Sequence, residues 1–165
     1  MTGEEGRKES HVAHHPEAEM YFDDFKVGVR FESPGITVTE GEIIRFALRY
    51  DPQAFHLDVE AAKQSPYGGL IASGFQTLGL SFRLFLQTGV FAACSLGAIG
   101  IDEVRWLLPV KPGDTLRVVS EVVEAKASSS KPDRGVARIK HTTLNQRGEA
   151  VQTMVGIHIL RRRPA

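Results

Sequence analysis

Two side chains with complementary chemistry stand close together in the segment RYDPQAFHLD: the carboxylate of Asp51 and the imidazole of His56. Pro52 has no backbone N–H and disfavours helical backbone in the residue before it, so Asp51 is expected at a helix end or in a loop. Imidazole changes its charge near neutral pH, and a neighbouring carboxylate can fix its tautomer or help to polarise water. The spacing therefore indicates an acid/base pair able to activate one water molecule.

A glycine-rich stretch follows this pair and leads into a long apolar segment. Gly68, Gly69 and Gly74 stand at the entrance, where a helix N-terminus would offer backbone N–H groups to an anion. A structural interpretation of the same residues stays open. The glycines would then serve a tight turn and close helix packing, His56 would be a core histidine with a satisfied hydrogen bond, and Asp51 would simply end a helix.

The composition excludes several classes of protein. The chain has 165 residues, of which 42% are hydrophobic, and its 20 basic side chains balance 20 acidic ones. This balance gives no field that would hold nucleic acid or an anionic membrane, so neither is expected as a partner, and the length suits one domain with a sizeable core. The single cysteine, Cys94, excludes an intramolecular disulfide; it is expected to be buried, and a cytoplasmic location is predicted.

The first 19 residues differ from the rest of the chain. They are charged and nearly free of large apolar side chains, which predicts a disordered leader over residues 1–19, and they hold no apolar stretch typical of a signal peptide. Their histidines lack a partner cysteine, so no metal site is expected there. A domain is predicted over residues 20–161, followed by a C-terminal tail over residues 162–165.

The elements around the candidate pair can be predicted from local signals. Alternating apolar residues over 27–38, interrupted by a Pro-Gly pair, predict a strand in two parts. Thr39 and Glu42 have the spacing of a capping box, and apolar residues then recur at helical spacing as far as Tyr50. This short helix would deliver Asp51.

Two further helices are predicted. Asp58 is expected to cap a short helix over residues 59–63. From residue 73 to residue 87, apolar side chains cover nearly the whole circumference, which predicts a central helix surrounded by protein. Polar residues interrupt this run, which also falls short of the roughly 20 residues that a bilayer requires, so a membrane span is not expected.

The C-terminal half has the two-residue period of strands. Runs at 96–108, 115–124, 136–144 and 150–161 are separated by turn residues, which predicts antiparallel strands with one buried face. In the last run one face carries Val151, Thr153, Val155, Ile157 and Ile159, and the other carries Gln152, Met154 and His158. The whole pattern predicts an α+β fold in which a sheet wraps around a central helix.

Three separated blocks carry a resemblance to a known family. They read DPQAFHLD, YGGLIASGFQT and LLPVKPGDTL, in that order. With these blocks the chain resembles the MaoC-type acyl dehydratases, a hotdog-fold family that includes (R)-specific enoyl-CoA hydratases. The resemblance covers residues 21–160. It implies a single hotdog fold, with an antiparallel sheet wrapped around a long central helix.

The resemblance also implies an activity and a site. The reaction would be reversible hydration of a trans-2-enoyl thioester to the (R)-3-hydroxyacyl thioester, with no metal or other cofactor. Asp51 and His56 match the dyad that activates water, and Gly74 matches the glycine whose backbone N–H faces the thioester oxygen. Ser73 stands where many members have a histidine, and the resemblance implies that it binds substrate beside Gly74. Gln53 stands where the commoner pattern has asparagine, and is a candidate positioning group.

Two other functions remain open at this point. Thioesterases with this fold commonly place a carboxylate on the central helix, and the absence of Asp and Glu from residues 73–88 disfavours thioester hydrolysis. A non-catalytic acyl-CoA-binding subunit is the other alternative, and the retained dyad argues against it. The resemblance further implies a homodimer or a higher even-numbered homo-oligomer. The uncharged apolar segment 87–98 is predicted to line the acyl pocket or to form the dimer contact.

Overall fold

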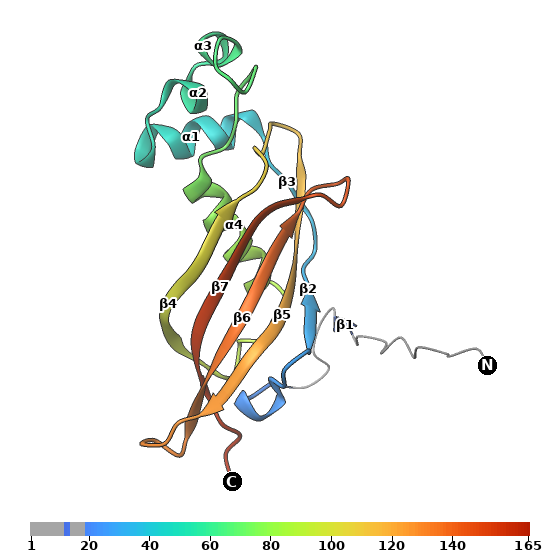
Figure 1. The fold of residues 1–165 in the computed structure, drawn as a ribbon, viewed down its shortest axis with the longest axis vertical. Helices are drawn as coiled ribbons and strands as arrows, with labels where there is room; N and C mark the ends of the chain where they lie inside the picture. The colour runs from blue at the N-terminus through green and yellow to red at the C-terminus, as the bar shows by residue number, and fades with distance from the viewer. Residues whose placement is uncertain (1–11, 14–18) are drawn as a thin grey trace, which may run out of the picture.

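The computed structural model describes residues 12–13 and 19–165, which form a long sheet, a helix packed across it and a group of short helices at one end (Figure 1). The elements in chain order are β1 (Val12–Ala13), the 3-10 helix η1 (Phe22–Asp24), β2 (Arg30–Glu32), β3 (Ile36–Thr37), α1 (Glu40–Tyr50), α2 (Ala54–Leu57), α3 (Val59–Lys63), α4 (Gly74–Leu86), β4 (Ser95–Trp106), β5 (Thr115–Ala127), β6 (Arg134–Leu144) and β7 (Ala150–Arg161).

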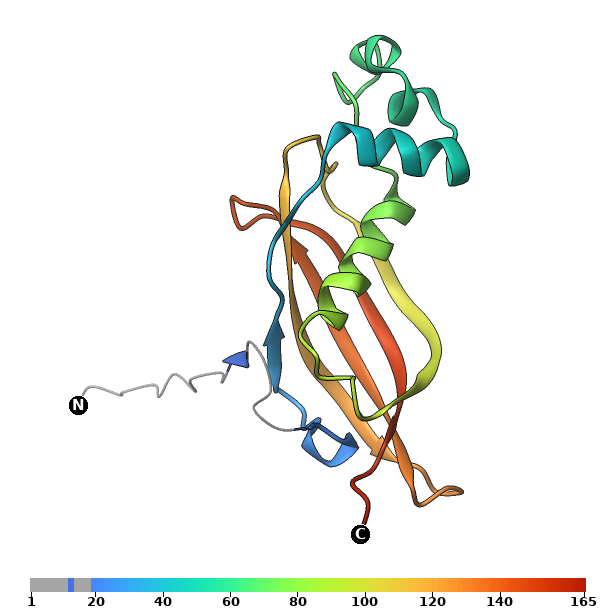
Figure 2. The ribbon, with the colours of Figure 1, turned by 180° about the vertical axis from the view of Figure 1, so that it is seen from behind.

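The sheet has the strand order β1-β2-β5-β6-β7-β4, and β3 pairs with the first two residues of β5. All of these pairs are antiparallel except the short pair of β1 with β2. Helix α4 lies across one face of the curved sheet, as the view from behind shows (Figure 2). The predicted α+β class and the hotdog arrangement, a sheet wrapped around a central helix, are therefore confirmed.

Local signals in the sequence explain how the end that carries α1 to α3 is built. The interrupted strand forms as β2 and β3. Thr39 accepts a hydrogen bond from the Glu42 N–H, and the Glu42 carboxylate accepts one from the Thr39 N–H, so the predicted capping box starts α1. The Asp58 carboxylate accepts from the Glu60 and Ala61 N–H groups and starts α3, also as predicted.

Among the described residues, buried apolar side chains form two clusters, and α4 contributes a side chain to each. One surrounds Phe85 and includes Phe25, Phe31 and Phe91; the other surrounds Leu84 near the α1 end. Cys94 is fully buried in the first cluster, as predicted, and burial raises the pKa of its thiol to about 11. Adjacent positions on α4 thus anchor the helix to both halves of the core.

The prediction that protein surrounds α4 on all sides is wrong for the described chain. Phe75 is 63% exposed and Leu86 is 44% exposed, and Gly79 and Arg83 are exposed with them. The sheet covers only one side of the helix, and α1 borders part of the other side without burying these residues. Apolar side chains around the whole helix therefore do not show that one chain buries every side of it.

The pattern of β7 also needs a correction. The strand is antiparallel, but its most deeply buried residues include the polar Gln152 and His158, together with Met154, whereas Ile157 and Ile159 are only half-buried. The alternation of side chains identifies the strand. It does not identify the buried face, because polar side chains occupy positions beneath α4.

Three further predictions concern the segment 87–98, the leader and the C-terminal tail. Within residues 87–98, Val90 and Phe91 pack in the core cluster around Phe85, and none of this segment lines the cavity described below. Its predicted contact with the acyl group or with a partner chain stays a prediction. Residues 1–11 and 14–18 lie outside the described residues, so the predicted leader stays a prediction. In the predicted tail, Arg162 and Arg163 form ion pairs with Asp23 and Asp24 of η1, which tie the chain end to the fold.

Candidate active site

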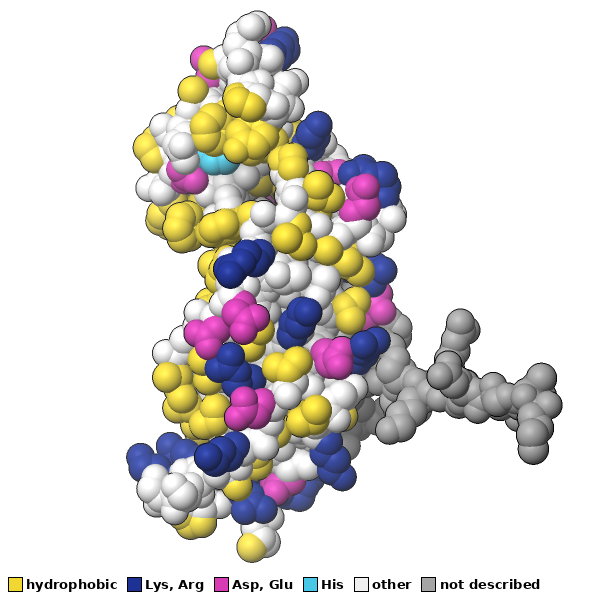
Figure 3. Space-filling view, viewed as in Figure 1, with side chains coloured by type: hydrophobic (Ala, Val, Ile, Leu, Met, Phe, Trp, Pro, Cys, Tyr) yellow, Lys and Arg dark blue, Asp and Glu magenta, His cyan; other side chains and the backbone are white. Residues whose placement is uncertain are grey.

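The candidate acid/base pair lies at the end of the molecule that carries α1 to α3. Asp51 is the C-cap of α1, Gln53 is the N-cap of α2, and His56 lies within α2. Together with the N-terminus of α4 they line a cavity of about 500 Å³. In the space-filling view a histidine side chain is visible in a hollow bordered by hydrophobic side chains at this end (Figure 3). The fold thus brings the predicted dyad and Gly74 to one cavity.

The hydrogen bonds of His56 determine which of its nitrogens can act on a substrate. Nδ1 lies 2.7 Å from the carbonyl oxygen of Ile71, and because a carbonyl only accepts, Nδ1 carries the hydrogen and donates it. In the neutral ring Nε2 is then an acceptor, 3.4 Å from Oδ2 of Asp51. Two acceptors at this distance share no direct hydrogen bond, but one water can donate to both.

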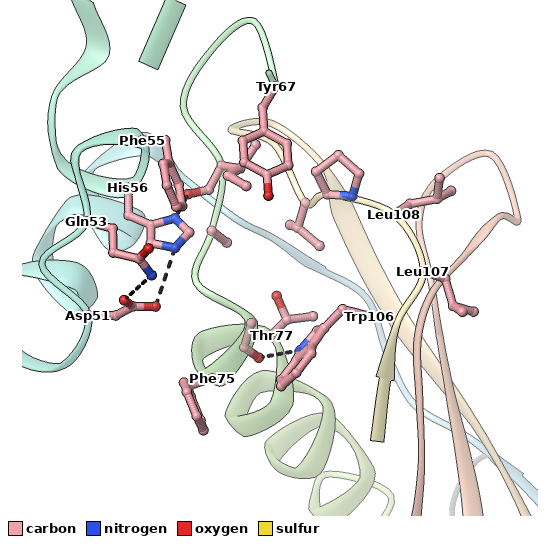
Figure 4. Close-up of a pocket in the computed structure, with 15 residues that line it drawn as sticks. Asp51, Gln53, Phe55, His56, Tyr67, Phe75, Thr77, Trp106, Leu107 and Leu108 are labelled. Atoms are coloured by element: carbon pink, nitrogen blue, oxygen red, sulfur yellow. Dashed lines mark hydrogen bonds and ion pairs between the residues drawn. The ribbon is translucent and has the colours of Figure 1, made fainter. Parts of the chain in front are cut away.

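Asp51 is held ionised by hydrogen bonds from two other predicted site residues. The Ser73 hydroxyl donates to Oδ2 at 2.6 Å, and the Gln53 amide donates to Oδ1 at 2.8 Å. The bond from Ser73 is the main cause that holds the pKa of Asp51 below its ordinary value; Gln53 and the nearby His56 act in the same direction, and burial opposes them. Figure 4 shows Asp51, Gln53 and His56 grouped on one side of the cavity.

Ser73 has a different position from the one that the resemblance implied. It is fully buried and does not line the cavity, so it cannot bind substrate directly in this arrangement. Its hydroxyl accepts a hydrogen bond from the Phe75 N–H and so caps α4, while it donates to Asp51. One hydroxyl therefore links the dyad to the first turn of α4.

Gly74 opens α4 and lines the cavity. The first N–H groups of a helix have no partner within the helix, and within the described residues no acceptor bonds to the Gly74 N–H. The positive end of the α4 dipole lies at the same point. A developing negative charge in the cavity would be stabilised here.

Aromatic side chains that sequence reasoning did not single out complete the cavity. Phe55 and Tyr67 lie near the dyad with ring centroids 5.4 Å apart, and Phe75 and Trp106 meet edge to face at 6.0 Å on the other side. The Trp106 indole N–H donates to the carbonyl of Gly74 at 2.9 Å. The sequence offered no signal for this contact, because the two residues are 32 positions apart.

In the part of the chain that the structure describes, no group of three His, Cys, Asp or Glu side chains is placed to hold a metal ion. Across the same residues, no helix has the length and hydropathy needed to span a bilayer.

Comparisons with known proteins agree with this architecture. The family model described as "MaoC like domain" matches residues 25–145. The uncharacterised protein YdeM of Bacillus subtilis is 31% identical over 128 residues, which cover 78% of this chain and 89% of that protein. The 3-hydroxyacyl-thioester dehydratase Z of Mycobacterium tuberculosis is 37% identical over 100 residues, which cover 59% of this chain and 64% of that protein.

A solved structure extends the match over nearly the whole fold. The crystal structure of a MaoC-like dehydratase from Rhodospirillum rubrum has a TM-score of 0.82 and 39% identity, and the match covers 88% of this chain and 99% of that one. The matched family region begins before β2 and runs through β6, and so includes the dyad, the α4 N-terminus and Trp106. This chain therefore belongs to the family of MaoC-like domains.

Proposed function

We propose that the protein catalyses the reversible hydration of a trans-2-enoyl thioester to the (R)-3-hydroxyacyl thioester. The observation that carries this proposal is the pair of acceptors, Nε2 of His56 and Oδ2 of Asp51, 3.4 Å apart at the cavity. The family includes relatives named as dehydratases, which supports the hydro-lyase class. The proposed substrate is a thioester of coenzyme A or of an acyl carrier protein.

The chemistry uses the groups in the positions described. A water held by Asp51 and His56 gives up a proton to the dyad as its oxygen bonds to C3 of the enoyl group, and the proton returns to C2 on the same face. Negative charge develops on the thioester oxygen, where the Gly74 N–H and the α4 dipole would stabilise it. Such a donor contributes about 3 kcal/mol, and positioned acid/base groups contribute about 10²- to 10⁴-fold in rate.

The same geometry disfavours the two alternatives. Helix α4 carries no Asp or Glu that would act in thioester hydrolysis. A subunit that only binds acyl-CoA has no need for an ionised carboxylate with two hydrogen-bond donors directed at it, as Asp51 has. Because the active form is proposed to be a homodimer, the partner would cover the exposed side of α4 and the free edge of β4.

The test is the loss of enoyl-thioester absorbance when the purified protein is mixed with crotonyl-CoA and with longer trans-2-enoyl-CoAs. We expect Asp51→Asn and His56→Ala each to lose at least about 10²-fold in kcat per folded molecule, with the folded fraction of each variant measured by circular dichroism. Asp58→Asn is the matched control, because Asp58 caps α3 outside the cavity and asparagine also caps helices well. Wild-type rates in either dyad variant would refute the assignment.

A further inference from the structure

The contact between Trp106 and Gly74 is closer than any other residue at position 74 would allow. A Cβ placed on Gly74 would lie 2.6 Å from Cε2 and 2.7 Å from Nε1 of the indole, well inside the closest approach of real atoms. Gly74 is not among the glycines with positive φ, so its backbone would suit an ordinary residue. The indole, and not the backbone conformation, therefore requires glycine at this position.

The indole also holds the backbone carbonyl of Gly74 by a hydrogen bond. Trp106 is the last residue of β4, and its N–H donates to the Gly74 carbonyl at 2.9 Å. On the preceding side of Gly74, the Ser73 hydroxyl is bonded to Asp51 at 2.6 Å. The peptide group between Gly74 and Phe75 is thus held at its carbonyl from the sheet, by Trp106, and at its N–H by the Ser73 hydroxyl, which in turn donates to Asp51.

Trp106 is not simply part of the core. It is 51% exposed and lines the cavity together with Gly74 and Thr77. In Figure 4 it lies across the cavity from Asp51, Gln53 and His56, with its indole against the first turn of α4. Trp106 is thus half-exposed at the cavity, and its indole N–H bonds to the carbonyl of the residue whose own N–H is the proposed oxyanion donor, which points to a role in the site.

We propose that Trp106 is a positioning residue, which holds Gly74 so that its N–H meets the thioester oxygen of a substrate whose enoyl group lies against the dyad. This inference rests on the proposed hydratase function. Trp106 itself transfers no proton and forms no bond to the substrate. Its contribution is to set the distance between the two halves of the site, one on α1 and α2 and the other on α4.

The first variant to test is Trp106→Phe, which keeps an aromatic ring and removes the indole N–H. We expect kcat for crotonyl-CoA to fall about tenfold or more, because a misplacement of about 1 Å is enough to cost 10²-fold, while KM changes by less than about threefold. A role in stability alone would leave kcat per folded molecule unchanged. Circular dichroism and the urea midpoint establish how much of each variant is folded.

The second test is a double-mutant cycle with Gly74→Ala and Trp106→Ala. Gly74→Ala keeps the backbone N–H but collides with the indole, so it should be at least about 10²-fold less active than the wild type. In the double variant the collision is absent, and we expect at least about tenfold more activity than in Gly74→Ala alone. If the collision prevents Gly74→Ala from folding, Trp106→Ala removes the collision and should restore folding in the double variant.

The outcomes separate the two proposals. If the wild type hydrates enoyl-CoA, but Trp106→Phe keeps the wild-type kcat and the double variant is no more active than Gly74→Ala, the positioning role is refuted and the hydratase function stands. If the wild type hydrates no enoyl-CoA of any chain length, the proposed function fails and the role of Trp106 falls with it. A lowered kcat in Trp106→Phe together with rescue in the double variant supports both.

Discussion

The serine hydroxyl at position 73 shows how one residue can join two parts of a site. Its donation to Asp51 keeps the carboxyl ionised, and its acceptance from the Phe75 N–H starts α4. The consequence can be measured as a pH dependence.

We predict that Ser73→Ala moves the acid limb of the kcat/KM profile to higher pH. The bond from Ser73 is the main cause of the lowered pKa of Asp51, so its removal raises that pKa, and the ionised form is lost at a higher pH. The variant should also lose about 1 kcal/mol of stability, because it removes the N-cap of α4. The check is the pH profile of crotonyl-CoA hydration.

Thr39→Ala is the control for this prediction. It removes the N-cap of α1 and a similar amount of stability, but Thr39 makes no contact with Asp51. Its acid limb should match that of the wild type. An unchanged acid limb in Ser73→Ala would mean that Asp51 is not the group whose ionisation limits the rate.

At the scale of elements, the interface between α4 and the strands beneath it contains buried polar side chains. His141 on β6 and His158 on β7 are both buried, with ring centroids 6.0 Å apart, and Nδ1 of His141 shares a hydrogen bond with the Ser120 hydroxyl. Burial lowers the pKa of His141 to about 3 and that of His158 to about 4. Both rings are therefore neutral in the folded protein at neutral pH.

We predict that this pair makes the fold lose stability as the pH falls. In the unfolded chain the histidines bind protons below about pH 6.5, whereas in the folded chain they stay neutral until about pH 3 to 4. Their contribution is complete above pH 6.5 and declines towards pH 4, by up to about 1.4 kcal/mol per pH unit for each ring. Urea unfolding at pH 7.5, 6.5, 5.5 and 4.5 measures it.

Comparison with His141→Gln isolates the effect from other titrating groups. Glutamine keeps a polar side chain near Ser120 but does not titrate, so the variant should lose stability less steeply between pH 6 and pH 4.5. The variant will be less stable at all pH values, and only the slope is compared. Equal slopes for the two proteins would contradict the buried neutral state of His141.

The elements themselves could be predicted where a local signal specifies them. The capping box at Thr39 and the cap at Asp58 place α1 and α3 correctly, because each depends on residues only a few positions apart. The buried face of β7 could not be predicted, because Gln152 and His158 lie beneath α4 against the polarity of their side chains. Strand periodicity therefore identified the sheet but not its orientation towards the helix.

The candidate site could be predicted only in part, for a related reason. Asp51 and His56 are close in sequence and carry the family pattern, so the resemblance indicates them. The contact of Ser73 with Asp51 spans 22 positions and that of Trp106 with Gly74 spans 32 positions. Contacts of this kind exist only after the sheet and helix have packed, and no local spacing encodes them.

At the scale of the whole molecule, the exposed apolar surface indicates how chains assemble. Phe75 and Leu86 on α4 are exposed, and β4, the last strand in the order of the described sheet, carries the exposed Ile99 and Ile101. An edge strand with exposed apolar side chains favours pairing with another chain.

We predict that the protein in solution has twice the mass of one chain of 18.1 kDa, or a higher even multiple, by light scattering after size exclusion. Ile101→Asp should shift the protein towards the monomer, because it places a charge on the edge strand. Val123→Asp is the matched control, since Val123 is 41% exposed but lies on the inner strand β5. A monomeric wild type would contradict the assembly.

Trp106 has one further property, which follows from the composition of the chain. It is the only tryptophan in the sequence, so the intrinsic tryptophan emission of the protein comes from one place, beside the first turn of α4 at the rim of the cavity. The indole is half-exposed, and its emission should change when a ligand displaces solvent from its surface. The molecule thus contains its own optical reporter, whose spectrum can follow occupancy of the cavity in real time with the unlabelled protein.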